Sequence, residues 1–450
     1  MGRYSYFVAT FSILPLTVIV GVLILFFSSR PAPAPTEAEG LEKDIQLYAE
    51  IRQRLLEHYD GELTEDQLRN AALEGLAHGT GDQYTRVLPP VKAQSQDLDL
   101  GGRFYGIGSV IRHNEDGSIR LLEPQPGGGA AKAGLLADDV VIAVDGVSIL
   151  GQPDENSLNR IKSAEEGTVV HLSILRGGDP ERGDDPKATR LEFDVTRSRV
   201  ESYSVHDVHL EERDGHRFGY MQISDINANT YDPQFKEAVA ELQTGGAEAL
   251  IIDLRGNGGG RVNVAVALVD GLIAEEGAMV VFTHSSRESN RGSDGEYRTR
   301  DAVAITDLPI VILVDNDTAS ASEIITGALK DHGRAYVIGE RTHGKGLVQT
   351  IYKLDTDPNY SLNITTTQYF TPLGRRVQNG KQGEPGGILP DLVIPYREGE
   401  ETKLHWRLRV RQARYNREEA AANSNWWNFE DRMLEAALDV LTGKPVTVKD

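Results

Sequence analysis

The alternation of apolar and polar residues divides the chain into segments of different character. Three short, continuous apolar runs predict strands that are buried on both faces. They lie at 249–254, 310–314 and 337–339. Helical patterns follow the first two runs, at 262–273 and 321–330. Because strands that alternate with helices form crossover units, the sequence predicts an α/β core with a mainly parallel sheet at 199–400.

Helical patterns also flank this core. Residues 41–97 begin with apolar residues at three- and four-residue steps, which predicts a helix. Thr64 and Gln67 form a capping-box pattern ahead of a second predicted helix at 68–76. We therefore expect an N-terminal helical arm at 41–97 and a helical tail at 401–450.

The N-terminal sequence predicts a targeting signal. Residues 7–27 form an uncharged apolar run that is long enough to cross a bilayer as a helix. The charge bias around this run favours a cytoplasmic N-terminus and an exported bulk. We expect a membrane signal anchor at 1–30, followed by an extended Pro/Ala/Glu-rich linker at 31–40. The alternative is a cleaved signal peptide.

Composition narrows the classes of function. The chain has 450 residues, with 47 Lys and Arg against 68 Asp and Glu, so its formal charge is −21. That charge argues against nucleic acid as the main partner, because phosphate binding needs a basic face. The cysteine count is 0, which excludes disulfides, thiolate zinc sites and a cysteine nucleophile.

Residues 98–198 are rich in glycine and in short β-type runs. The stretch at 130–135 and the turns after it resemble a PDZ domain. Gly106, Ile107 and Gly108 match the carboxylate-binding loop of that family. Such a loop presents backbone N–H groups to a peptide C-terminus, and the peptide adds to the sheet as a strand.

Ser320 lies where a predicted strand gives way to a helix. The N–H groups at a helix N-terminus stabilise negative charge, which suits a nucleophile that forms an oxyanion. The alternative is that Ser320 or Ser322 only caps the helix, as serines often do.

Lys345 offers a base for such a serine. If residues 347–351 form a strand, Lys345 and Gln349 face the same side of it. A lysine acts as a base only when neutral, and burial can lower its ordinary pKa of ~10.4 by several units. The alternatives are a solvated loop lysine at this position, and His332 or His343 as the base.

Glycines at 258–260 follow a buried strand and precede a helix. They leave backbone N–H groups bare for an oxyanion, or they simply make a tight connection. No H-E-x-x-H motif is present, so a zinc protease is not indicated and no metal is expected.

Taken together, these segments resemble the C-terminal processing proteases, also called tail-specific proteases, over roughly residues 41–396. The resemblance rests on the segments 253–260, 320–324, 344–349, 371–375 and 387–391. It implies a crotonase-like ββα core with an inserted PDZ domain, a Ser–Lys dyad and no cofactor. The implied roles are Ser320 as nucleophile, Lys345 as general base, Gln349 as orienting residue, and Gly259 and Ala321 as oxyanion donors.

Two departures from that family concern the oxyanion loop, where Gly256 and Gly258 replace the usual Asn and Pro. The expected substrates are proteins or peptides with free C-termini, and oligomerisation is left open. One competing function is a non-catalytic PDZ scaffold that binds C-terminal tails. Another is a crotonase-like acyl-CoA enzyme, against which the export segment argues.

Overall fold

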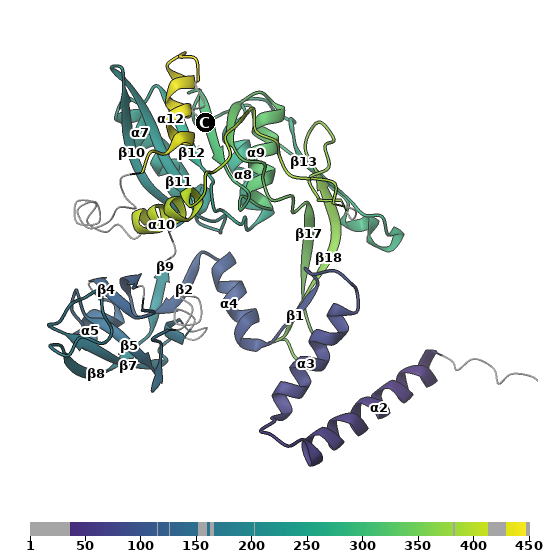
Figure 1. Ribbon diagram of the computed structural model, residues 1–450. Coiled ribbons are helices and arrows are strands. Elements are labelled where there is room, and N and C mark those ends of the chain that lie inside the picture. The colour runs from purple at the N-terminus through teal and green to yellow at the C-terminus, as the bar shows by residue number, and fades with distance from the viewer. Residues whose placement is uncertain are drawn as a thin grey trace, which may run out of the picture. The chain divides into compact units, whose positions relative to one another are not determined.

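Figure 1 shows the computed structural model, which describes residues 37–114, 116–125, 127–151, 160–162, 166–201, 203–380, 383–412 and 429–446. The chain divides into two compact units, Met1–Gly75 and Leu76–Asp450. The predicted membrane-spanning run at 7–27 lies outside the described residues. Within the ranges that the structure describes, no helix is long and apolar enough to cross a bilayer.

The first unit contains helix α2 (Glu37–His58) and the start of helix α3 (Glu65–His78). Helix α2 begins inside the predicted linker, because the alanine and glutamates there favour helix. The capping box is confirmed at the start of α3. The Thr64 amide donates to Gln67 Oε1 at 2.7 Å, and the Gln67 amide donates to Thr64 Oγ1 at 3.2 Å.

The module expected at 98–198 contains an antiparallel sheet in the order β3-β4-β5-β7-β8, with β6 paired to β5. Its elements are β3 (Ser109–His113), β4 (Ile119–Pro124), helix α5 (Gly129–Ala133), β5 (Val140–Val144), β6 (Val147–Ser148), β7 (Val169–Arg176) and β8 (Thr189–Thr196). The fully buried Leu121, Val141 and Leu172 lie in its core. Strands β2 (Arg103–Gly106) and β9 (Ser198–Glu201) pair at the two chain ends of the module.

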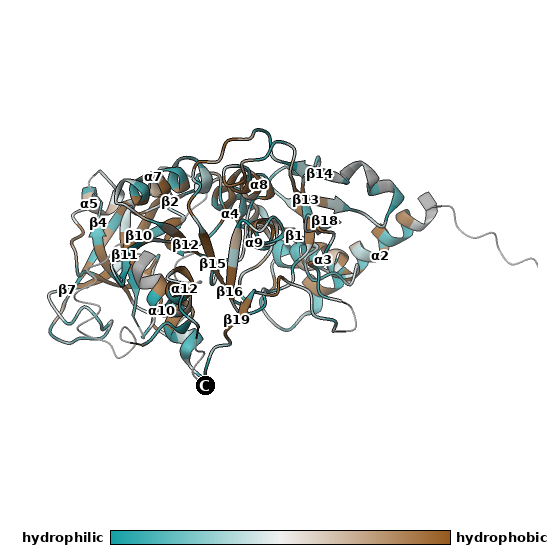
Figure 2. Ribbon diagram, turned by 90° about the horizontal axis from the view of Figure 1, so that it is seen from above, coloured by the Kyte–Doolittle hydropathy of each residue, from teal (hydrophilic) through white to brown (hydrophobic). Residues whose placement is uncertain are grey.

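The α/β core contains a six-stranded sheet in the order β10-β11-β12-β15-β16-β19. Its strands are β10 (Val205–Arg213), β11 (His216–Ile223), β12 (Ala249–Asp253), β15 (Ile310–Val314), β16 (Ala335–Gly339) and β19 (Leu392–Val393). All neighbours pair in parallel except β10 and β11, so the predicted mainly parallel sheet is confirmed. Figure 2 shows the apolar strands β12, β15 and β16 in brown.

Both faces of this sheet are covered. On one face lie the π-helical turn η1 (Thr230–Phe235) and helices α7 (Lys236–Thr244), α8 (Val262–Asp270) and α9 (Ala321–Asp331). The opposite face packs against α12 (Arg432–Leu441). Leu250 and Ile252 of β12 belong to the first core and Ile251 to the second. This double burial explains the continuous apolar runs in the sequence.

A second sheet has the order β1-β18-β13-β14, and β17 also pairs with β18. Its strands are β1 (Arg86–Leu88), β13 (Met279–His284), β14 (Gly295–Arg298), β17 (Leu347–Lys353) and β18 (Ser361–Phe370); the 3₁₀ turn η2 (Glu288–Ser293) joins β13 to β14. Strand β1 and the following helix α4 (Pro90–Leu100) come from the segment expected to be a helical arm. That segment therefore also supplies a strand to the second sheet.

The region expected to be a helical tail contains α10 (Glu400–Gln412) and α12, with residues 413–428 outside the described part. Helix α12 is not an appendage, because its Met433, Leu434 and Leu438 are buried against the parallel sheet. Its apolar residues recur at helical spacing and provide the cover that the second face of the sheet requires.

Candidate active site

The loop after β12 approaches the start of helix α9. Asn257 holds the loop, since its Nδ2 donates to the Ile223 carbonyl at 2.8 Å and its Oδ1 accepts from the Gly259 amide at 2.9 Å. Gly259 has a φ of +98°, and a Cβ there would lie 2.6 Å from the Ala319 carbonyl oxygen and 2.9 Å from Ser320 Cβ. Only glycine allows this backbone to approach the serine so closely.

Ser320 occupies the position before the first residue of α9, with a φ of 57° and a ψ of −117°. This conformation is strained for a residue with a side chain, and such strain concentrates at functional sites. The turn that carries Ser320 is tied to the glycine loop, because the Ala319 amide donates to the Asn257 carbonyl at 2.9 Å. Ala321 is the first residue of the helix, where a backbone N–H has no partner within the helix.

One buried carboxylate holds Ser320 and Lys345 side by side. Glu323 Oε2 accepts from the backbone amides of Ser320 at 2.8 Å and Lys345 at 2.9 Å. Glu323 Oε1 accepts from Thr342 Oγ1 at 2.6 Å and from the Gly344 amide at 2.7 Å. Glu323 is fully buried, and this burial raises its pKa. Three of the four hydrogen bonds join the start of α9 to the loop that carries Lys345, and the fourth lies within the helix N-terminus.

A tyrosine makes a second link between the same two residues. The Tyr369 hydroxyl lies 2.9 Å from the Ser320 carbonyl oxygen and 2.8 Å from the Lys345 carbonyl oxygen. Tyr369 comes from β18, is only 1% exposed and packs in the main core. The backbones of Ser320 and Lys345 are therefore fixed by two independent side chains.

Lys345 lies at the entry to β17 in a partly buried environment. Its Nζ sits 4.9 Å from the centre of the Tyr84 ring. Burial lowers the pKa of Lys345, and the positive charge of Arg86 lowers it further. A lowered pKa is what a lysine base requires.

Gln349 interacts with the same tyrosine. Its amide Nε2 donates a hydrogen bond to the Tyr84 backbone carbonyl. Lys345, Leu347 and Gln349 all line one cavity, as the strand alternation predicts. Val348 lines it as well, because the pairing of β17 with β18 shifts between Val348 and Gln349.

This cavity has a volume of about 760 Å³ and brings together four of the five predicted catalytic and oxyanion residues; Ala321 does not line it. Its lining residues include Arg86, Gly258, Gly259, Gly260, Arg261, Ser320, Lys345 and Gln349. The alternative bases lie elsewhere. His332 follows the C-terminal end of α9, where its Nε2 lies 2.7 Å from the Met279 carbonyl oxygen, and the exposed His343 does not line the cavity.

Sequence reasoning missed Glu323, Tyr369, Tyr84 and Arg86 as contributors to this site. A signal existed for Glu323, since Ser320 and Glu323 have capping-box spacing. No local pattern marks the other three, because each lies far from Ser320 in the sequence: Tyr84 in the turn before β1, Arg86 in β1 and Tyr369 in β18.

The predicted peptide-binding loop joins β2 to β3. Gly108 has a φ of +68°, and a Cβ there would lie 2.9 Å from Gly128 Cα. The Ile107 carbonyl accepts from the Ala130 amide at 2.6 Å, and the Gly108 carbonyl accepts from the Gln125 amide at 2.9 Å. These bonds hold the loop against the start of α5.

Comparison with known proteins identifies the family of the chain. The sequence profile of peptidase family S41 matches residues 217–394, and a PDZ-domain profile matches residues 121–176. A carboxyl-terminal-processing protease of Picosynechococcus sp. is 31% identical over 336 residues, covering 74% of each chain. The protein of the same name from Synechocystis sp. is 30% identical over 396 residues, covering 85% of this chain and 86% of that one. Among solved structures, a photosystem II D1 C-terminal processing protease is 26% identical, covers 77% of this chain and 86% of its own, and gives a TM-score of 0.42. The chain therefore belongs to peptidase family S41 and is a serine peptidase with a PDZ domain.

Proposed function

We propose that the chain cleaves peptide bonds through a Ser320–Lys345 dyad. The Ser320 hydroxyl attacks the substrate carbonyl, and neutral Lys345 Nζ takes its proton and passes it to the leaving amine. Water then attacks the acyl-enzyme and releases the new C-terminus. The supporting observation is the Glu323 carboxylate, which holds the backbones of both residues through one oxygen atom. Activity assays of Ser320 and Lys345 variants test this proposal and are described in the Discussion.

The same proposal assigns the oxyanion to the backbone N–H groups of Ala321 and Gly259. Ala321 supplies a helix N-terminal donor. The Gly259 amide already donates to Asn257, so it would share its hydrogen between Asn257 Oδ1 and the oxyanion. For Gln349, the contact with Tyr84 supports an indirect role, in which Gln349 and Tyr84 together form the wall against which Lys345 lies.

The finer architecture is part of the proposal. The parallel sheet with α8 and α9 on one face supports a crotonase-like ββα core. The proposed domain limits remain 41–97 for the arm, 98–198 for the PDZ domain and 199–400 for the core. Export with an anchor at 1–30 rests on the hydropathy of the sequence alone.

The pH dependence of cleavage should respond to Arg86. Replacing Arg86 by glutamine removes a positive charge that lowers the pKa of Lys345, so that pKa rises. Because the neutral amine is the base, the ascending limb of kcat/KM moves to higher pH. Arg86 is exposed, so added salt should reduce the difference between variant and wild type.

The matched control is Arg261→Gln, since Arg261 lines the same cavity but is not among the charges that shift Lys345. Its ascending limb should coincide with that of the wild type. If the ascending limb of kcat/KM in Arg86→Gln stayed at the wild-type pH, Arg86 would not lower the pKa of the catalytic base.

The PDZ domain is proposed to select substrates with a free C-terminus, as the names of the relatives suggest for those proteins. In the full chain with Ser320→Ala, which prevents cleavage, a tail peptide with a free carboxylate should bind roughly tenfold more tightly than its amide. Backbone N–H groups of the loop at 106–108 would hold the charge that the amide lacks. Calorimetry with matched peptides measures this ratio, and equal affinities would count against C-terminal recognition.

A further inference from the structure

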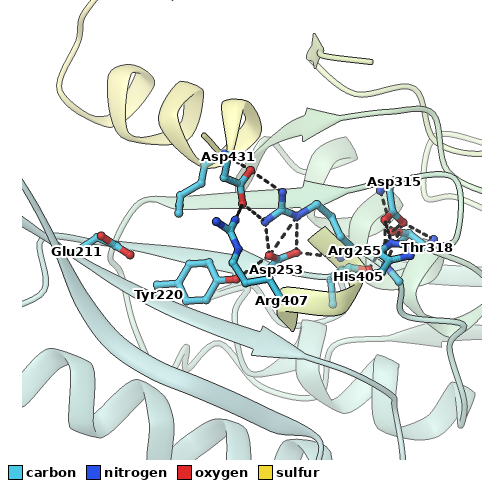
Figure 3. Close-up of polar contacts among 12 residues, drawn as sticks. Glu211, Tyr220, Asp253, Arg255, Asp315, Thr318, His405, Arg407 and Asp431 are labelled. Atoms are coloured by element: carbon cyan, nitrogen blue, oxygen red, sulfur yellow. Dashed lines mark hydrogen bonds and ion pairs between the residues drawn. The ribbon is translucent and has the colours of Figure 1, made fainter. Parts of the chain in front are cut away.

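A buried charge network lies behind the glycine loop. Arg255 is 1% exposed and stands between two carboxylates, as Figure 3 shows. Its Nε donates to Asp253 Oδ1 at 2.9 Å, while Nη1 and Nη2 donate to Asp431 Oδ1 and Oδ2 at 2.8 and 2.9 Å. Arg407 Nη2 donates to Asp431 Oδ2 at 2.6 Å. Two guanidinium groups and two carboxylates thus contact one another in this network.

The C-terminal segment supplies half of this network. Arg407 belongs to α10, and Asp431 is the N-cap of α12. Both lie outside the residues matched by the family S41 profile. Burial alone would raise the pKa of Asp431, yet Arg255 and Arg407 outweigh it and hold that pKa well below its usual range. Asp431 is therefore a carboxylate at every pH at which a lysine base works.

A second link connects the same segment to the turn before the nucleophile. Buried Asp315 Oδ1 accepts from the Gly256 amide at 3.0 Å and from the Thr318 amide at 3.0 Å. Asp315 Oδ2 lies 3.0 Å from His405 Nε2 and 3.2 Å from the Tyr396 hydroxyl. His405 and Tyr396, which contact this carboxylate, again lie beyond residue 394, where the family S41 profile ends.

The Asp431–Arg255 link and the Asp315 link both reach the two segments that carry the proposed oxyanion donors. Arg255 and Gly256 lead into the loop that carries Gly259, and Asp315 opens the turn that leads to Ser320. A buried guanidinium that loses one of two carboxylates is left with uncompensated charge, so the loop that carries it has to shift. A misplacement of about 1 Å is enough to cost catalysis about 100-fold.

We propose that Asp431 is a positioning residue for the oxyanion loop, through Arg255, and that the contacts of Arg407, His405 and Tyr396 belong to the same support. This inference rests on the proposed assignment of Ser320 as nucleophile and Gly259 as oxyanion donor.

The test compares full-length wild type with Asp431→Asn. Asparagine caps a helix as well as aspartate, so the start of α12 is retained while the charge opposite Arg255 is lost. We expect kcat to fall by roughly 10- to 100-fold with little change in KM. The dissociation constant of a peptide boronate, whose tetrahedral adduct on Ser320 places an oxygen in the oxyanion site, should rise by a similar factor.

Two further variants separate positioning from general stability. Glu435→Gln breaks the pair between α12 and Arg213 without touching Arg255, and it should keep wild-type kcat and boronate affinity. Asp431→Asn combined with Arg407→Met restores the net charge of the network and should recover part of the lost kcat and boronate affinity. If the single variant does not fold, this double variant tests the inference in its place. Wild-type kcat and boronate affinity in folded Asp431→Asn would overturn the inference. Failure of the dyad proposal would look different, because the wild type itself would then not bind the boronate through Ser320.

Discussion

Replacing Ser320 or Lys345 by alanine should abolish cleavage, with kcat/KM falling by roughly 10⁴-fold or more, because each residue of a dyad is useless without the other. Lys345→Arg should be equally inactive, since a guanidinium stays protonated at any working pH and cannot accept the serine proton. Gln349→Ala should lose less, because the glutamine contacts Tyr84 and does not take part in proton transfer. Cleavage of a peptide substrate, measured together with circular dichroism, checks both activity and fold.

Lys353→Ala is the matched control for the lysine, because Lys353 ends the strand that Lys345 precedes but is half-exposed and pairs with Asp97. Its kcat/KM should stay near that of the wild type. Turnover close to normal in Lys345→Ala would contradict the lysine-base mechanism and would favour a histidine base, although neither His332 nor His343 lines the cavity.

Glu323→Gln should lower kcat by about 100-fold and destabilise the fold by about 3 kcal/mol. Glu323 accepts four hydrogen bonds on two oxygens, whereas glutamine has one oxygen and an NH₂ group. Whichever way the amide is turned, a buried backbone N–H then faces another donor. The amides of Ser320 and Lys345 lose their common acceptor or the Gly344 amide loses its own, and the two loops separate.

Thermal unfolding and kcat measured well below the melting temperature separate the two effects of this change. Lys330→Gln is a useful control, because Lys330 lies at the other end of the same helix and pairs with Asp391. Lys330→Gln should lower the free energy of unfolding without a comparable loss of kcat. If Glu323→Gln loses only stability and turns over at the wild-type rate, the shared carboxylate does not position the dyad.

The apolar pattern predicted the central strands well. The runs at β12, β15 and β16 stand out because each strand is covered on both faces, so every side chain along them has to be apolar. In the structure the glycine loop and Ser320 lie together, since both follow the carboxyl ends of neighbouring parallel strands at one edge of the sheet.

Other features were beyond any local pattern. Tyr84, which contacts both Lys345 and Gln349, is 265 residues from Gln349, and its strand neighbours were expected to be helical. Strand β1 is only three residues long, too short to show a periodicity of its own, and it forms because the edge of β18 supplies its hydrogen bonds. The register shift between β17 and β18 likewise depends on both strands.

The sequence by itself determined the α/β core, the PDZ module, the family and the three polar residues that line one cavity, because those properties depend on burial period and on short motifs. Only the tertiary structure decided what surrounds the proposed dyad: the carboxylate of Glu323 that binds the backbones of Ser320 and Lys345, the ring of Tyr84, and the contact of Asp431 with Arg255 across 176 residues. The physical reason is that a periodic pattern records whether a side chain is buried. It does not record which distant group contacts that side chain, and such contacts set the pKa of a base and the position of a loop.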